Sequence, residues 1–138
     1  MAVQSPWDIS VEDLKRLRDE KADFVLLDVR EPREYQICHL DGKLIPLGQL
    51  PGRISELDPS AHIVVHCRSG GRSANAVKAL RGAGFENVWN LNGGILAWIE
   101  RIDPSLTPEI DAWIRVLNMN LQEWSLILRE KQRLQQAR

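Results

Sequence analysis

One stretch of this chain joins a strand to a helix through a glycine-bearing turn that carries a cysteine. The β-branched run Ile63-Val64-Val65 predicts a short buried strand, and residues 74–80 follow a helical pattern. Between them lies His66-Cys67-Arg68-Ser69-Gly70-Gly71-Arg72-Ser73. A chain that enters a tight turn from a strand and leaves it as a helix directs backbone N–H groups and a helix N-terminus at the turn. This arrangement predicts an anion cradle around Cys67.

The residues of this turn favour the thiolate form of Cys67. Arg68 and Arg72 add two permanent positive charges to those of the backbone amides. A free cysteine with a pKa near ~8.5 is about 3 % thiolate at pH 7, and lowering the pKa by ~2 units makes the thiolate the majority species. We therefore expect Cys67 to be a nucleophile. The alternative is an inert cysteine buried at the end of a strand.

The cradle itself is expected to consist of the loop residues after the cysteine. Its predicted members bind the substrate or its negative charge: Arg68, Ser69, Gly70, Gly71, Arg72 and Ser73. Ser73 has a second possible role, as the cap of the following helix.

Strand and helix patterns alternate along the first hundred residues. We expect helices at 10–20, 31–36, 48–57, 73–82 and 95–101, and strands at 24–29, 44–47, 62–66 and 87–91. This alternation predicts an α/β domain with a parallel sheet covered by helices on both faces. Such sheets carry their sites at the carboxyl ends of the strands, where the cysteine loop lies.

The composition changes near Asp103, which divides the chain into a domain at 1–104 and a helical extension at 105–138. Thr107-Pro108-Glu109 predicts the start of a long amphipathic helix that runs to about Gln136. Its apolar stripe has heptad-like spacing: Ile110, Ile114, Leu117, Leu121, Trp124 and Leu128. We expect this helix to pair with a second copy in a homodimer, rather than to cover its own domain or lie on a membrane surface.

The bulk composition excludes several classes of protein. The chain has 138 residues and a net charge of −1, so charge provides no argument for nucleic-acid binding. Cys38 and Cys67 are too few for a disulfide scaffold, and the sequence shows neither a signal peptide nor an apolar run long enough to span a bilayer. We expect a cytoplasmic protein.

Three motifs in order resemble those of single-domain rhodanese-like sulfurtransferases. The loop Cys-Arg-Ser-Gly-Gly-Arg-Ser at 67–73 is similar to the family's active-site loop, residues 26–35 to its upstream signature, and residues 93–98 to its closing signature. The resemblance implies a five-stranded parallel sheet, with an additional strand near residues 7–9. Residues 93–105 also resemble the C-terminal sulfur-transfer domain attached to MoeB-like activating enzymes, although this chain has no Gly-x-Gly-x-x-Gly nucleotide-binding loop.

The resemblance implies sulfur transfer through a Cys67 persulfide, from thiosulfate or a persulfide donor to a thiophilic acceptor. Protein donors or acceptors are possible partners, and no metal or organic cofactor is expected. Cdc25-like phosphatases and arsenate reductases share the architecture but carry five residues between the cysteine and the arginine, whereas this chain carries four between Cys67 and Arg72. A different alternative is a binding module that docks a partner through its C-terminal helix.

Several residues near the loop are open to two interpretations. Asp28 and Arg30 are expected to support the strand end beside the loop, and Arg30 either pairs with Glu34 or receives an anionic substrate. His66 is expected to pack beneath the sheet rather than act as a base, since neighbours on a strand point to opposite faces. Cys38 stands where the family usually has glycine, and is either a packed side chain or a resolving thiol.

Overall fold

A five-stranded parallel sheet forms the centre of the molecule. The computed structural model describes residues 6–106 and 121–136 of the chain. The strands lie in the order β1-β5-β4-β2-β3, and every neighbouring pair is parallel. Their bounds are Asp8–Ile9 for β1, Val25–Asp28 for β2, Lys43–Leu44 for β3, Ile63–His66 for β4 and Val88–Leu91 for β5. The predicted sheet, including the short strand near residues 7–9, is confirmed.

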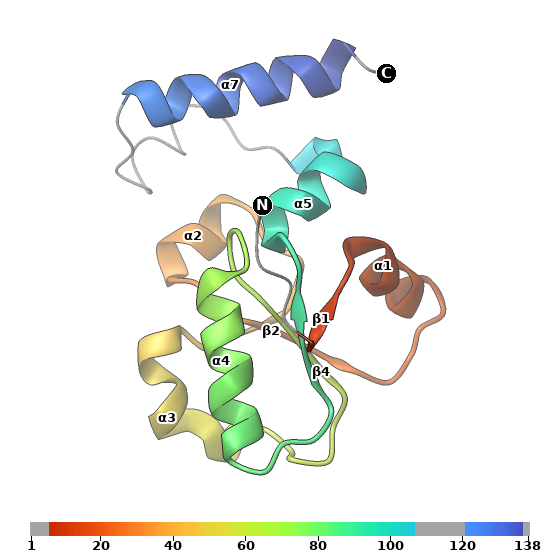
Figure 1. Cartoon of the computed structure of the whole chain (residues 1–138), viewed down its shortest axis with the longest axis vertical. Helices are drawn as coiled ribbons and strands as arrows, with labels where there is room; N and C mark the ends of the chain where they lie inside the picture. The colour runs from red at the N-terminus through yellow and green to blue at the C-terminus, as the bar shows by residue number, and fades with distance from the viewer. Residues whose placement is uncertain (1–5, 107–120, 137–138) are drawn as a thin grey trace.

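Helices cover both faces of this sheet, as the alternating pattern predicts (Figure 1). One face carries α3 (Leu50–Arg53) and α4 (Gly71–Gly82), and the other carries α1 (Val11–Asp19) and α5 (Gly94–Arg101). Two apolar clusters fill the layers, one including Ile63, Val65 and Leu80 and the other including Leu14, Val64 and Ile95. Alternate β4 side chains enter opposite clusters, as expected for a strand buried on both faces.

Helix α1 begins at a reciprocal cap that the sequence predicts. The Ser10 hydroxyl accepts from the Asp13 amide at 3.1 Å, and the Asp13 carboxylate accepts from the Ser10 amide at 3.3 Å. Each contact satisfies an amide that the first helical turn leaves without a partner. Leu14 is completely buried and Leu17 is partly buried, so both face inward as predicted.

The segment after β3 is less regular than predicted. A single helix is expected over residues 48–57, but the structure has two 3₁₀ turns, Leu47–Gln49 and Ile54–Glu56, on either side of the four-residue α3. Pro51 and Gly52 lie inside this stretch, and neither residue type supports a helix interior. Helix α2 (Pro32–Ile37), by contrast, forms as predicted, with proline in its first turn.

The C-terminal extension is described over α7 (Leu121–Gln136). Residues 107–120 lie outside the described part of the chain, as do the side chains of Leu121, Trp124 and Leu128, so the predicted stripe and homodimer stay predictions. Arg133 of α7 lies 3.0 Å from Glu100 of α5, and both side chains are exposed. Among the described helices, none combines the length and apolarity needed to cross a bilayer.

Candidate active site

The cysteine loop wraps backbone donors around the sulfur of Cys67. Cys67 follows β4, and Gly70, at φ +110°, caps α4, which begins at Gly71, two residues earlier than predicted. The sulfur accepts from the Gly70 amide at 3.1 Å and from the Ser73 amide at 3.4 Å. The Ser73 amide is one of the N-terminal amides that an α-helix leaves free. The side chain of Cys67 is 1 % exposed, so the loop encloses it.

The pKa of the Cys67 thiol is lowered from its ordinary value. Burial raises this pKa, but hydrogen bonds from the Ser73 hydroxyl and from the amides of Ser73, Gly70 and Ser69 lower it by more. Donors around the sulfur stabilise the charged form, whereas removal from water destabilises it. The result is the thiolate-favouring cradle that the sequence predicts, formed by the Ser73 hydroxyl and the three amides.

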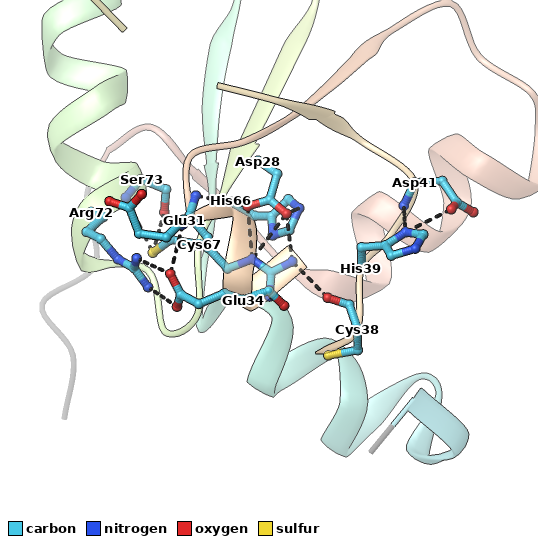
Figure 2. Close-up of polar contacts among 11 residues, drawn as sticks. Asp28, Glu31, Glu34, Cys38, His39, Asp41, His66, Cys67, Arg72 and Ser73 are labelled. Atoms are coloured by element: carbon cyan, nitrogen blue, oxygen red, sulfur yellow. Dashed lines mark hydrogen bonds and ion pairs between the residues drawn. The ribbon is translucent and has the colours of Figure 1, made fainter. Parts of the chain in front are cut away.

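Arg72 is held by a carboxylate that the sequence analysis did not place in the site. Its guanidinium donates to the two carboxylate oxygens of Glu34 at 2.7 and 2.8 Å (Figure 2). Glu34 lies on α2 and is buried. Desolvation raises the pKa of its carboxyl, but the hydrogen bonds and charge of Arg72 oppose this effect, and the pKa is lowered from its ordinary value. The attraction between Arg72 and Cys67 raises the pKa of Arg72 in turn, after the larger effect of Glu34. The signal available in the sequence was the position of Glu34 inside the 26–35 motif.

Asp28 and Arg30 form a buried pair at the end of β2. The Asp28 carboxylate accepts from Nε of Arg30 at 2.9 Å and from its Nη2 at 2.7 Å, and the two residues are 0 % and 2 % exposed. Arg30 also donates to the backbone carbonyls of Cys38 and Glu34. The pair lies at the strand end, where these two residues are expected to give support. The expected Arg30–Glu34 side-chain pair is wrong, because the Glu34 carboxylate turns to Arg72, and a fully engaged, buried Arg30 is not placed to receive a substrate.

His66 packs inside the protein, as the strand alternation predicts. It is completely buried, and its Nε2 lies 3.7 Å from a carboxylate oxygen of Asp28. Burial lowers the pKa of His66 to about 4, so the imidazole is neutral near pH 7. Neither ring nitrogen has a hydrogen-bond partner among the described residues, and the structure does not bring this ring to the sulfur of Cys67.

Cys38 is a packed side chain in this structure. It is 7 % exposed, and burial raises the pKa of its thiol. In Figure 2 Glu34 lies between the two cysteines, and their side chains pack in different apolar clusters. This geometry does not support the resolving-thiol interpretation.

A chain of polar side chains behind the loop was missed entirely. The Ser73 hydroxyl donates to the side-chain oxygen of Asn90 at 2.5 Å, and the side-chain nitrogen of Asn90 donates to Asp8 at 3.0 Å. Ser73 and Asn90 are buried, at 0 % and 4 % exposed. Ser73 is the third residue of α4 rather than its cap, which is Gly70. Of its two predicted roles, the structure therefore supports the one in the cradle.

The glycine at position 94 lets α5 approach the back of the cysteine loop. The amide of Ile95 donates to the Cys67 carbonyl at 2.9 Å, and that of Leu96 donates to the Arg68 carbonyl at 3.1 Å. Gly94 has φ +62°, and a Cβ atom there would lie 2.4 Å from the Arg68 carbonyl oxygen. The closing motif, residues 93–98, therefore has a structural role. The amides of α5 bind the loop carbonyls, while the loop amides face the sulfur.

The remaining predicted members of the cradle lie along its rim. Ser69 and Gly71 are exposed and Arg68 is half-buried.

Within residues 6–106 and 121–136, no three His, Cys, Asp or Glu side chains lie close enough together to hold a metal ion.

The fold and this loop define a protein of the rhodanese-like class. The sequence model of the rhodanese-like domain matches residues 10–101, and the chain belongs to that family. A protein from Allochromatium vinosum named sulfurtransferase is 36 % identical over 103 residues, which cover 74 % of this chain and 96 % of that protein. The probable adenylyltransferase/sulfurtransferase MoeZ of Mycobacterium tuberculosis is 35 % identical over 101 residues, or 71 % of this chain and 26 % of that one.

A solved structure agrees with these sequence matches. The rhodanese-related protein of Thermoplasma volcanium superposes with a TM-score of 0.63 at 32 % identity, covering 69 % of this chain and 92 % of that one. The chain spans 26–36 % of the length of several curated relatives, including MoeZ. The predicted likeness to single-domain sulfurtransferases and to the domain attached to activating enzymes is therefore confirmed.

Proposed function

We propose that this protein is a sulfurtransferase that carries sulfane sulfur as a persulfide on Cys67. The main support for this proposal is the set of donors around the Cys67 sulfur. Two amides lie at 3.1 and 3.4 Å, and the pKa of the thiol is lowered in spite of burial. Such a site stabilises a thiolate before the reaction and a negatively charged persulfide after it. The relative from Allochromatium vinosum named sulfurtransferase supports the same activity.

The reaction has two displacement steps. The Cys67 thiolate attacks the outer sulfur of thiosulfate, a new S–S bond forms, and sulfite leaves with the electron pair of the old bond. An acceptor nucleophile, cyanide in an assay or a thiol in a protein, then attacks the outer sulfur of the persulfide. The Cys67 thiolate leaves with the electron pair and is ready for another cycle. No change in net oxidation state and no added oxidant is required.

The four-residue spacing between Cys67 and Arg72 supports sulfur rather than phosphate as the transferred group. The loop encloses Cys67 so closely that it is 1 % exposed, which suits a covalent adduct of one sulfur atom better than a covalently bound phosphate group. The donor proposed for assay is thiosulfate, and a persulfide on a small molecule or a carrier protein is the second donor of the same chemistry. A carrier protein is also the proposed macromolecular partner.

Intact-mass analysis after thiosulfate treatment tests this function. We expect the full chain to gain about 32 Da, the mass of one sulfur atom, and to lose it on addition of cyanide. The Cys67→Ser variant should gain nothing, and the Cys38→Ser variant should behave as the unchanged protein. If neither thiosulfate nor a persulfide donor adds sulfur to Cys67, the sulfurtransferase proposal is wrong, and a binding module becomes the better interpretation.

A further inference from the structure

The hydroxyl of Ser73 has one proton and three neighbours that could accept it. The Asn90 side-chain oxygen lies at 2.5 Å, the Gly70 carbonyl oxygen at 3.2 Å and the Cys67 sulfur at 3.4 Å. The two carbonyl-type oxygens accept hydrogen bonds but cannot donate them. The sulfur can do either, as a thiol donor or a thiolate acceptor. The direction of this one O–H bond therefore depends on the state of Cys67 and on the orientation of Asn90.

Asp8 determines the orientation of the Asn90 amide. The two residues are direct partners in the β1–β5 ladder, so their side chains lie on the same face of the sheet. The Asn90 nitrogen donates to the Asp8 carboxylate at 3.0 Å. A carboxylate only accepts, so the inverted amide would place two oxygens against each other. Asn90 must therefore present its oxygen to Ser73, which is buried and has to donate to it.

The contact between Ser73 and Asn90 limits how far the Ser73 hydroxyl can stabilise a thiolate at Cys67. With the Ser73 proton on Asn90, a lone pair of the Ser73 oxygen faces the Cys67 sulfur, and the thiol donates to it. When the sulfur becomes negative, the Ser73 O–H bond has to turn toward it, because a lone pair facing a thiolate is repulsive. That turn leaves the Asn90 oxygen buried without its donor, which is unfavourable. The loop amides, by contrast, face the sulfur in either state.

We propose that Asp8 and Asn90 are positioning residues for Cys67: Asp8 orients the Asn90 amide, and Asn90 holds the Ser73 O–H bond away from the sulfur until negative charge forms there. The chain of contacts makes Cys67 a weaker acid than it would be if the Ser73 hydroxyl were free to donate to the sulfur, while the amides of Gly70 and Ser73 still stabilise the thiolate. A thiolate that forms less readily spends less time exposed to oxidation, and the same hydroxyl is still available when a persulfide carries the charge. The catalytic use of this device rests on the proposed function.

Other charged groups around the loop stay in place in the variants that test this idea. Arg72 of α4 attracts the sulfur and is bound by Glu34 of α2, and the buried Asp28–Arg30 pair stands at the end of β2. His66 of β4 is neutral near pH 7, and Arg68 lies on the loop itself. None of these residues contributes to the contacts among Asp8, Asn90 and Ser73.

Titration of the Cys67 thiolate in the full-length protein is the test. The ultraviolet absorbance of the thiolate is followed against pH, with the matching Cys67→Ser protein as the blank, so that Cys38 cancels. Asp8→Asn frees the Asn90 amide to invert and the Ser73 hydroxyl to donate to the sulfur. We expect the midpoint to fall by about one pH unit, a tenfold change in the ionisation constant. Asp8→Ala, a second variant without the acceptor, should move it in the same direction.

A second pair of proteins separates this mechanism from simple removal of a negative charge. In a Ser73→Ala background the hydroxyl is absent, so Asp8→Asn should leave the midpoint unchanged. An equal shift with and without Ser73 would overturn the proposal, as would an unchanged midpoint in both Asp8 variants. The titration uses no sulfur donor. Failure of the thiosulfate experiment would therefore overturn the proposed function without affecting this result, and the reverse also holds.

Discussion

Glu34 and Arg72 hold each other through two hydrogen bonds of 2.7 and 2.8 Å, although 38 residues separate them in the chain. The contact ties α2 to the first turn of α4 beside the cysteine loop (Figure 2). Because the carboxylate already balances the guanidinium charge, the amides of the loop have a larger share in stabilising the sulfur. An incoming anion has to share Arg72 with Glu34.

Removing the Glu34 charge should destabilise the fold. We expect Glu34→Gln to lower the free energy of unfolding at pH 7 by about 1–2 kcal/mol, less than for a fully buried pair because Arg72 is 36 % exposed. The pKa of Glu34 is lowered in the folded state, so its stabilisation is present above the unfolded pKa and is lost as pH falls through the folded one. Urea unfolding at pH 7 and at about pH 3 should show the difference between the two proteins narrowing in acid. The exposed Glu86→Gln variant is the control, and equal stability of Glu34→Gln and the unchanged protein at pH 7 would contradict the prediction.

Burial of His66 should make stability depend on pH in a range where few groups titrate. Its pKa falls from 6.5 to about 4 on folding, so unfolding takes up a proton between these values. Stability is therefore complete above the unfolded pKa and decreases as pH falls toward the folded one. We expect a loss of about 2 kcal/mol from pH 7 to pH 5, measured by urea unfolding. That slope should disappear in His66→Gln and persist in the half-buried control His62→Gln; a His66→Gln protein with an unchanged slope would refute the assignment.

The close approach of α5 to the cysteine loop should make Gly94 intolerant of any side chain. A Cβ atom at Gly94 would lie 2.4 Å from the Arg68 carbonyl oxygen. The substituted L-residue would also have to adopt φ +62°, which is strained. We expect Gly94→Ala to lower the free energy of unfolding by at least about 2 kcal/mol, because loop or helix must move. Gly82→Ala is the matched control, since a Cβ atom at Gly82, the last residue of α4, has nothing within 4 Å. Thermal melts of both variants test this prediction. Equal melting temperatures would contradict it, because they would show that the loop accommodates the added Cβ atom at little cost.

The buried Arg30 should contribute to stability and not to substrate binding. We expect Arg30→Lys to cost at least about 2 kcal/mol of unfolding free energy, because an ammonium group cannot bind Asp28 and two carbonyls in the same geometry. The exposed Arg33→Lys, in the first turn of α2, should change stability by less than about 0.5 kcal/mol. If sulfur transfer is measured, the KM for thiosulfate should be the same in Arg30→Lys as in the unchanged protein. A raised KM with unchanged stability would contradict this prediction and indicate that Arg30 binds the substrate.

Local patterns were sufficient to predict most elements of the fold. The reciprocal Ser10–Asp13 cap begins α1, and the apolar run at Ile63 forms the central strand, because each depends on residues close together in the chain. The predicted helix over 48–57 is wrong because Pro51 and Gly52 interrupt it, which leaves the four-residue α3 between two 3₁₀ turns. The cysteine loop was predictable as a motif since its donors, Gly70 and Ser73, lie within six residues of Cys67.

The sequence by itself determined that Cys67 enters a glycine turn between a strand and a helix, where free amides must face it. Tertiary structure alone decided which side chains meet there: Glu34 at Arg72, Asn90 at Ser73, Asp8 at Asn90, and Gly94 against Arg68. These contacts depend on the strand order β1-β5-β4-β2-β3, which places β5 between β4 and the first strand of the chain. Local spacing restricts residues a few positions apart, whereas strand order and register are set by how complete sheet and helix faces pack together. For that reason the nucleophile can be identified from its motif, but the residues that tune it cannot.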